Sequence, residues 1–203
     1  MTTAAIDVGF LYSGPPANHV RVRVARDLPD LMRVFALRAI VYMAEQVCPY
    51  DEEFDGNDFA GATHLLAEID GEPVATLRLR WFADFVKVER VAVKAEHRGG
   101  AVVKSLFGEA VRLAAKRGYT HAIGHIQARL EPFWRRMGFF QRLDRARFRF
   151  SDHDYIEVEG RIERDPEALS TETPPLVLLR PEGCWDAEGP LDKSASRAAT
   201  CPC

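Results

Sequence analysis

The residues whose types and spacing most clearly suit ligand binding form one short turn, Arg98-Gly99-Gly100. It lies between an alternating apolar run and a helical pattern. The first N–H groups of a helix have no intrahelical partner, and the helix dipole favours negative charge at that end. Glycine lets a phosphate group approach the backbone closely, and Arg98 adds a charge-assisted donor. The turn is therefore either an anion cradle or a tightly packed connection, because paired glycines are common in both.

Titratable side chains lie on the two predicted strands that flank this turn in the sequence. Side chains alternate between the two faces of a strand. The face predicted to carry Glu89 consists of Lys87, Glu89, Val91 and Val93, with Arg90 and Ala92 opposite. On the next strand His121 and His125 share a face, and histidine is a common proton-transfer residue. A strand histidine is also commonly a core or edge residue, so both interpretations stay open.

An acidic segment is the second region whose side chains could bind a ligand. It places five carboxylates in eight residues: Asp51, Glu52, Glu53, Asp55 and Asp58. They suit a cationic substrate, or a metal ion with hard oxygen ligands, although the EF-hand spacing is absent. A third interpretation is a cap that pairs with Arg78, with Arg80 or with the arginine-rich run 129–149.

That run carries seven arginines in 21 residues: Arg129, Arg135, Arg136, Arg142, Arg145, Arg147 and Arg149. Arg145, Arg147 and Arg149 alternate with other residues and are expected on one strand face. Such a face suits a cofactor phosphate, a carrier protein or an acidic substrate. The plainer interpretation is a strand face in contact with solvent.

The pattern of apolar residues predicts an α/β domain with a mixed sheet and helices on both faces. Helices are expected from the Asp27 N-cap to about Gln46, over 101–117 and over 132–137. The predicted strands are 19–27, a hairpin over 64–82 that turns at Asp70-Gly71, 85–93, 120–127, 139–150 and 154–160.

Composition is that of an ordinary globular protein, with 203 residues, 47% hydrophobic and 28% charged. The net charge of −3 is too small to indicate nucleic acid as a partner. No apolar run approaches the roughly 18 residues of a membrane span, and no basic region precedes the first apolar stretch, so we expect a cytoplasmic protein. Residues 161–203 hold 5 basic and 8 acidic residues and several prolines, which predicts a partly extended or disordered segment. Within it, Cys201 and Cys203 lack partner ligands at zinc spacing.

Four stretches together resemble the GNAT superfamily of acyl-CoA-dependent N-acyltransferases. They are the hairpin HLLAEIDGEPVATLRLR, the strand VERVAV, the turn EHRGGAVV and the motif FWRRMGF. The resemblance covers about residues 20–160, leaving an N-terminal extension over 1–19 and a C-terminal one over 161–203. It implies the GNAT fold, acetyl-CoA or another acyl-CoA as co-substrate without a metal, and acyl transfer, most simply of acetyl, to a primary amine of a small molecule, a lysine or an amino terminus.

The same resemblance implies roles for particular residues. The backbone of Val91, Ala92 and Val93 would meet the pantetheine arm. The pyrophosphate would lie on Arg98, Gly99, Gly100, Ala101, Val102 and Val103, although Glu96, or Ala101 and Val103, depart from the two common forms of the motif. Glu89 is the expected base, unless it pairs with Arg80 or Arg90, and His125 is a second catalytic candidate. Trp134 stands where many members have a tyrosine that protonates the leaving thiolate, and indole cannot supply that proton.

The acidic segment also resembles acyl-homoserine-lactone synthases and related N-acyl amino acid synthases, through Asp55, Asp58, Thr63 and Arg78. We therefore expect Asp55, Asp58, Arg80 and Trp134 to contact substrate. Under this alternative the acyl chain is long and comes from acyl carrier protein. A second alternative, motivated by Trp134, is a non-catalytic acyl-CoA-binding module. Either class is compatible with a homodimer.

Overall fold

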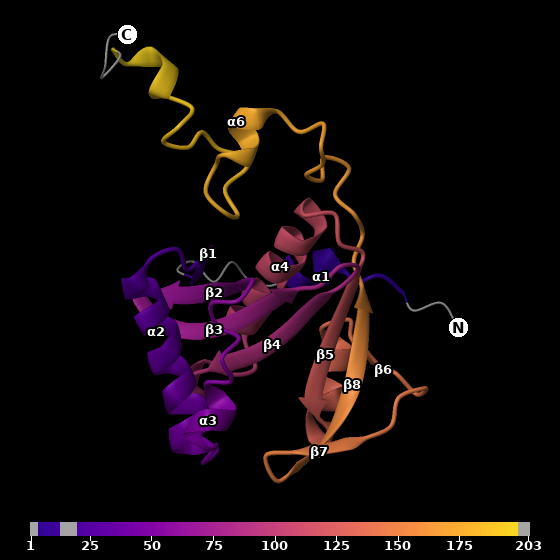
Figure 1. The fold of residues 1–203 in the computed structure, drawn as a ribbon. Helices are drawn as coiled ribbons and strands as arrows, with labels where there is room; N and C mark the ends of the chain where they lie inside the picture. Colours follow the sequence, from indigo (N-terminus) through magenta and orange to yellow (C-terminus); the bar gives the residue numbers. More distant parts are fainter. Residues whose placement is uncertain (1–3, 13–19, 199–203) are drawn as a thin grey trace.

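The computed structural model describes residues 4–12 and 20–198, and in this part of the chain eight strands form one mixed sheet. Figure 1 shows the sheet with helices on both sides, which confirms the predicted fold class. The spatial order is β1 (Val20–Val24), β2 (Ala62–Ile69), β3 (Glu72–Trp81), β4 (Val86–Val93), β5 (His121–Gln127), β8 (His153–Arg161) and β6 (Phe140–Gln141). The short β7 (Phe148–Phe150) also pairs with β8.

The sheet is divided where β4 meets β5. Strands β1 to β4 form an antiparallel meander, and β5 pairs antiparallel with β8 along its whole length. The parallel pairing between β4 and β5 extends over only two registered pairs, Val86 with Ala122 and Lys87 with Ile123. Beyond them the two strands separate, as Figure 1 shows. Their diverging carboxyl ends leave main-chain groups of both strands without a neighbouring strand.

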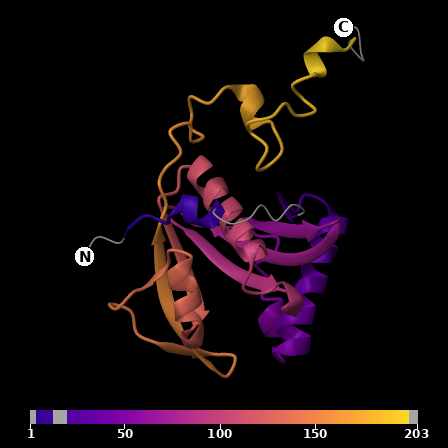
Figure 2. The ribbon, with the colours of Figure 1, turned by 180° about the vertical axis from the view of Figure 1, so that it is seen from behind.

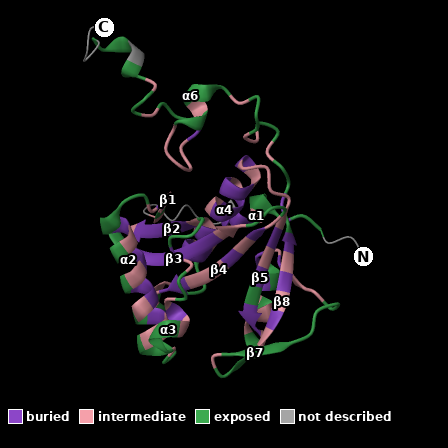
Figure 3. Cartoon of the chain, viewed as in Figure 1, coloured by how far each residue is buried: buried purple, intermediate pink, exposed green. Residues whose placement is uncertain are grey.

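Helices α2 (Leu28–Arg38) and α4 (Ala101–Lys116) cover opposite faces of the meander. The side chain of Leu66 packs with Val34 and Leu37 of α2, whereas Leu65 belongs to the larger core that contains Leu106 of α4. Consecutive strand residues point to opposite faces, so both faces of β2 are buried. The view from behind in Figure 2 places α4 in front of the sheet, and Figure 3 shows the buried residues concentrated in the central strands and α4.

Most predicted elements are present, and their ends follow the expected local chemistry. The Asp27 side chain accepts a hydrogen bond from the Asp30 amide and caps α2. The hairpin turns at Asp70 and Gly71, both with positive φ, which suits a type I′ turn. Gly118 and Gly138 follow α4 and α5 (Glu131–Arg136) with φ of 85°.

Three parts of the chain differ from the prediction. Helix α2 continues directly into a π-helix, η1 (Ala39–Glu45). The acidic segment contains a one-turn helix, α3 (Tyr50–Glu53). Residues 139–150 form not one strand but β6 and β7, separated by an exposed loop over 143–147. The arginines of this loop therefore face solvent, as the plainer interpretation expected. Short connections complete the domain: η2 (Ala95–His97), η3 (Ala128–Leu130), α6 (Pro175–Leu178) and η4 (Ser194–Ser196).

The two predicted extensions both contribute to the core. Before residue 20, α1 (Val8–Tyr12) was not predicted, yet Ile6 and Leu11 are buried with the main cluster. After residue 160, Trp185 is buried in the same cluster and Gly183 packs on Val24. The C-terminal segment, predicted to be partly extended or disordered, is therefore anchored to the core at Trp185. Cys201 and Cys203 lie outside the described residues. No helix of the described part is long and apolar enough to cross a membrane.

Candidate functional site

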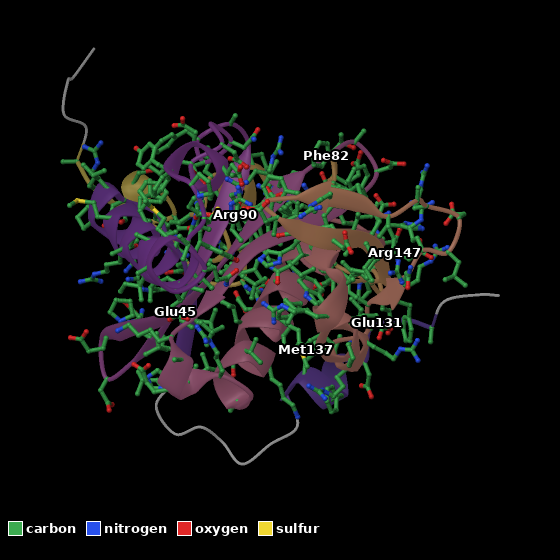
Figure 4. The ribbon with its side chains drawn as sticks, turned by 90° about the horizontal axis from the view of Figure 1, so that it is seen from below. Glu45, Phe82, Arg90, Glu131, Met137 and Arg147 are labelled. Carbon is green, nitrogen blue, oxygen red and sulfur yellow. The ribbon has the colours of Figure 1, made fainter. Side chains whose placement is uncertain are left out.

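A cavity of about 360 Å³ lies where β4 and β5 separate. Its walls come from both strands, from η1, from the turn before α4, from η3 and α5, and from β8. The lining residues are Val41, Tyr42, Gln46, Val88, Glu89, Arg90, Val91, Val93, Arg98, Gly99, Val103, His125, Ile126, Gln127, Arg129, Leu130, Phe133, Trp134 and Tyr155. Figure 4, seen from below, shows Glu45 of η1 and Arg90 of β4 toward the left and Arg147 of the exposed loop toward the right.

A bulge in β4 shapes the inner wall of the cavity. Thr76 of β3 pairs with Ala92 and Arg78 pairs with Glu89, so β4 has one extra residue between these pairs. Arg90 takes up the extra length with a φ of 51°, a left-handed conformation that is uncommon for arginine. The bulge reverses the alternation of side chains, and Val93 packs in the core with Val86 and Val88. The predicted common face of Glu89 and Val93 is therefore wrong, because a regular alternation cannot include a bulge.

Arg90 is held in this conformation by the segment around α3. Its guanidinium donates to the main-chain carbonyls of Glu52 and Glu53, at 2.7 and 3.3 Å, and pairs with the carboxylates of Glu53 and Asp55, at 3.2 and 3.1 Å. On the other side, the Tyr42 phenol donates a 2.7 Å hydrogen bond to the main-chain carbonyl of Val91. The bulge is thus fixed from both η1 and the acidic segment.

Three carboxylates of the acidic segment, those of Glu53, Asp55 and Asp58, are committed to buried arginines. Arg38 and Arg78 are both fully buried. Arg38 pairs with Glu53 and Asp58, and Arg78 pairs with Asp58 at 2.7 Å and Asp55 at 2.7 Å. The interpretation as a cap that pairs with Arg78 is confirmed, and Arg38 and Arg90 are partners that the sequence did not indicate. Neither Asp55, Asp58 nor Arg80 lines the cavity.

The same pairings change the pKa values of these carboxyl groups. Burial opposes ionisation of Asp58, but hydrogen bonds and charge from Arg38 and Arg78 outweigh it and hold its pKa below the ordinary value. Burial has the larger effect on Glu53 and raises its pKa, despite the charge of Arg38. These ion pairs therefore stabilise the fold, and they leave little free negative charge for binding a cationic ligand.

Glu89 lines the cavity but is also engaged in ion pairs. Its carboxylate lies 2.8 Å from Arg78 and 2.8 Å from Lys87, while Arg80 is farther away at 3.9 Å. Burial opposes its ionisation, but the hydrogen bond from Lys87 and the charge of Arg78 hold the pKa of Glu89 below its usual value. A carboxylate with a lowered pKa is a weaker base. The pairing alternative is confirmed with Arg78 and Lys87 as principal partners in place of Arg80 or Arg90.

His125 lines the cavity with a carboxylate behind it. Its Nε2 atom lies 2.9 Å from the Glu157 carboxylate, which also accepts a 3.0 Å hydrogen bond from Arg142. The Phe148 ring packs edge-on against the imidazole at 5.2 Å. A histidine whose ring is oriented by a carboxylate is a common arrangement for proton transfer. His121 does not line the cavity and contacts Thr120 and Arg161 instead.

The turn before α4 has the geometry expected of an anion cradle. Gly99 has a φ of 74°, and Gly100 is the N-cap of α4 without a side-chain hydrogen bond. A Cβ atom placed on either glycine would meet no heavy atom within 4 Å, so the space above them is open. Arg98 and Gly99 line the cavity. Arg98 itself donates to the Val93 carbonyl at 3.0 Å and pairs with Glu45, which holds the turn against β4 and η1.

The remaining residues of the predicted phosphate loop are arranged unequally. Val103 lines the cavity, but its side chain is also part of the core, together with that of Val102. Gly100, Ala101 and Val102 do not contribute to the lining. Ala92 is fully buried beside the bulge. Their contribution to a bound ligand is therefore limited to main-chain N–H groups at the start of α4 and along β4.

Trp134 forms an apolar wall of the cavity. Its indole is buried and packs edge-to-face on Phe107 at 5.2 Å and on Phe139 at 5.1 Å. Gly124 makes room for it, because a Cβ atom there would lie 3.2 Å from the indole. Substitution of tyrosine by this larger residue is thus accommodated within the core. Trp134 contributes shape to the cavity and no ionisable group.

The structure adds two tyrosines and a glutamine that sequence reasoning missed. Tyr42, Gln127 and Tyr155 all line the cavity. Burial raises the pKa of the Tyr42 phenol, and the negative charge of Glu53 raises it further. Burial also raises the pKa of the Tyr155 phenol, and the side-chain N–H of Gln127 partly opposes that rise. Both phenols are therefore protonated near neutral pH, and that of Tyr42 donates to the Val91 carbonyl. The alternation of DYIEVEG already put Tyr155 on one face with Glu157, but only the sheet order brings that face beside β5.

No group of three His, Cys, Asp or Glu side chains that could hold a metal ion occurs among residues 4–12 and 20–198. The cavity is instead bounded by one carboxylate, Glu89, and by three arginines, Arg90, Arg98 and Arg129. A positive lining beside an open glycine turn suits an organic anion with phosphate groups. Comparison with known proteins points to the same kind of ligand.

A model of the acetyltransferase (GNAT) family matches residues 31–139. The chain is 30% identical over 121 residues to YjcF, an uncharacterized N-acetyltransferase of Bacillus subtilis (strain 168), which covers 57% of this chain and 82% of YjcF. It is also similar to the crystal structure of an acyl-CoA N-acyltransferase from Pseudomonas aeruginosa, with 28% identity, a TM-score of 0.60 and coverage of 70% and 98% of the two chains.

A further similar structure is FeeM, an N-acyl amino acid synthase from uncultured soil microbes, at 14% identity. Its TM-score is 0.61, and the match covers 71% of this chain and 91% of FeeM. This likeness concerns the fold alone. Because the family model spans more than half of the 203 residues, the chain belongs to the acetyltransferase (GNAT) family and is an enzyme of that family.

Proposed function

We propose that the enzyme transfers an acetyl group from acetyl-CoA to a primary amine within the cavity between β4 and β5. The observation that carries this proposal is the continuity of the cavity with the open turn at Arg98 and Gly99. Family membership implies an acyl-CoA co-substrate, and a molecule of that kind needs both a phosphate cradle and a slot for an extended arm. One continuous cavity provides both.

The residues present fit acyl-CoA. The pyrophosphate would lie against the N–H groups from Gly99 to Val103, where a Cβ atom on either glycine meets open space. The main chain of Val91 and Val93 would bind the pantetheine amides, since β5 pairs with β4 only as far as Lys87. Bound in this way, acyl-CoA supplies an activated thioester carbonyl beside the bulge. Arg98, through its bond to the Val93 carbonyl, keeps the two binding surfaces in register.

Transfer requires the acceptor ammonium to lose a proton. The neutral nitrogen then forms a bond to the thioester carbonyl carbon and releases its second proton to solvent. The carbon–sulfur bond breaks, and the sulfur leaves as a thiolate that takes up a proton. His125, oriented by Glu157 at 2.9 Å, is the better candidate for the base. Glu89 is the weaker one, because Arg78 and Lys87 both hold its carboxylate.

The leaving thiolate needs a donor other than Trp134. Tyr155 is the candidate on the β8 side of the cavity, and its partly buried phenol stays protonated near neutral pH. The Tyr42 phenol already donates to the Val91 carbonyl, so its proton is committed. We assign Tyr155 to stabilise or protonate the sulfur, and replacement by phenylalanine should lower kcat more than it changes the KM for acetyl-CoA.

The test measures thiol release from acetyl-CoA and from a long-chain acyl-CoA with a panel of free amines, amino acids and peptides. Release that depends on both acetyl-CoA and an amine is the expected result. Release with the long-chain thioester alone would favour an N-acyl amino acid synthase that takes its chain from acyl carrier protein. Lack of any binding of CoA by calorimetry would contradict the proposed function.

A further inference from the structure

Two cavity-lining groups, Gln127 and Arg129, are not used by the functions assigned above. Gln127 ends β5, and Arg129 follows in η3 two residues later. Both line the cavity on the side of β5 and β8, where Gln127 is registered opposite Tyr155. Among the described residues, Gln127 has an unpaired hydrogen-bond acceptor, and Arg129 has a positive charge without a paired anion. These two groups indicate which groups a second ligand must contain.

Gln127 presents a buried acceptor without a donor. Its side chain is more than nine-tenths buried, with 8% exposure. The carboxamide nitrogen points to the Gln46 carboxamide at 3.4 Å, whereas Oε1 has no hydrogen-bond partner. An acceptor left unpaired in a buried position costs free energy, so such atoms are normally satisfied by a ligand or by water. An N–H group of a bound ligand would satisfy it here.

Arg129 presents a cation without an anion. The other two arginines of the cavity are committed, Arg90 to Glu53 and Asp55, and Arg98 to Glu45. In the described part of the chain, no carboxylate lies within ion-pair distance of Arg129, and its charge acts on the phenol of Tyr155. A guanidinium at the rim of a cavity is suited to bind a carboxylate or phosphate in a fixed orientation.

The phosphates of acyl-CoA already have a separate cradle at the start of α4. That cradle follows β4, whereas Arg129 follows β5 and lies next to β8. The two anion-binding positions are thus on different strands of the divided sheet. The distance of Arg129 along the fold from that cradle favours the acceptor as the source of an anion at Arg129.

Building on the proposed function, we propose that the acceptor is an amine that also carries an anionic group, such as the carboxylate of an amino acid. Arg129 binds the anion, and Gln127 Oε1 receives an N–H of the amine. His125, two residues before Gln127 on β5, then takes the ammonium proton and shares its charge with Glu157. As the nitrogen forms the amide bond it releases a second proton to solvent, the carbon–sulfur bond breaks, and the thiolate takes a proton from the Tyr155 phenol, which solvent then restores.

The experiment compares thiol release from acetyl-CoA with free amino acids and with the corresponding amino acid amides, which lack the carboxylate. For the wild-type enzyme we expect kcat/KM for the acids to exceed that for the amides by about tenfold or more, the scale of a charged hydrogen bond. In Arg129→Ala this ratio falls to about one through KM for the acid, and Arg129→Lys restores part of it. Arg136→Ala is the matched control, because Arg136 is exposed on α5 and does not line the cavity.

Calorimetry with CoA separates the two possible anions. If Arg129 serves the acceptor, Arg129→Ala binds CoA with a Kd within about twofold of the wild-type value. A large loss of CoA affinity, or equal use of acids and amides by the wild type, would overturn this inference and leave the proposed function standing. Absence of thiol release with every amine, with or without an anionic group, would overturn both.

Discussion

The Tyr42 phenol donates a 2.7 Å hydrogen bond to the main-chain carbonyl of Val91, the residue that follows the left-handed Arg90 in the β4 bulge. This bond joins the π-helix η1 to the strand that would meet the thioester. The position of the bulge in β4 therefore depends on how η1 packs against the strand. Loss of the phenol should therefore affect catalysis through the geometry of β4.

We predict that Tyr42→Phe lowers the free energy of unfolding by about 1 kcal/mol, the usual net value of one hydrogen bond. The larger effect should fall on kcat, because the main-chain groups around Val91 lose their fixed orientation. Urea unfolding and steady-state kinetics measure the two effects. Tyr50→Phe, at a phenol that is 63% exposed, is the matched control and should change neither. Equal kinetic constants for Tyr42→Phe and wild type would refute the positioning role.

A second prediction separates the two candidate bases. His125→Gln should lower kcat by about 10²–10⁴, the range expected for a general base. Glu89→Gln should lower kcat by less than about tenfold, but should reduce stability because Arg78 and Lys87 lose a common partner. Thiol release and thermal unfolding of both variants decide the matter. If Glu89→Gln loses as much activity as His125→Gln while remaining folded, the assignment to His125 is wrong.

A third prediction concerns the buried ion pairs of Arg38. Arg38→Met removes a fully buried cation and leaves Glu53 and Asp58 with fewer positive partners. We expect the free energy of unfolding to fall by about 3–5 kcal/mol. Arg33→Met, at a side chain with 47% exposure and weaker pairing, should cost less than about 1 kcal/mol. Comparable losses in the two variants would show that burial of the network contributes little.

The fourth prediction is a pH dependence that arises from Asp58. Its pKa is lower in the folded protein than in the unfolded chain, so its ion pairs stabilise the fold fully above about pH 4 and are lost as the pH falls through the folded value. The stability of Asp58→Asn should therefore be lower than that of wild type at neutral pH, with the difference shrinking below about pH 4. Urea unfolding across this range measures it.

The sequence predicted the fold because the alternating and helical patterns are strong in β2, β3, β4 and α4, and because Gly118 and Gly138 terminate their helices as expected. It did not predict α1, whose five residues carry too short a pattern. The flipped face of Val93 was missed for a different reason. A bulge depends on cross-strand pairing with Thr76 and Arg78, and pairing is not encoded in the alternation of one strand.

The candidate site was predicted in part. The glycine turn, the bulge strand, His125 and Trp134 all line the cavity, whereas Asp55, Asp58 and Arg80 do not. Charge alone could not distinguish carboxylates that bind a substrate from those that pair with a buried arginine. Arg38 illustrates this, because it occupies an ordinary position in a helical pattern. Nothing in that pattern indicates that Glu53, Asp55 and Asp58 would pair with Arg38 or with Arg78. Tyr155 lies far along the chain from the turn and reaches the cavity only through the pairing of β5 with β8.

Binding of acetyl-CoA to a pair of variants at Gly100 measures whether the turn before α4 holds the pyrophosphate. Aspartate and asparagine are both good N-cap residues, so Gly100→Asp and Gly100→Asn should keep or raise the stability of α4. Only aspartate places a negative charge where the pyrophosphate would lie. By titration calorimetry we expect one-to-one binding by wild type, similar binding by Gly100→Asn, and a loss of affinity of at least about tenfold in Gly100→Asp. Equal affinity of the two variants for acetyl-CoA, or no binding by the wild-type protein, would contradict the account.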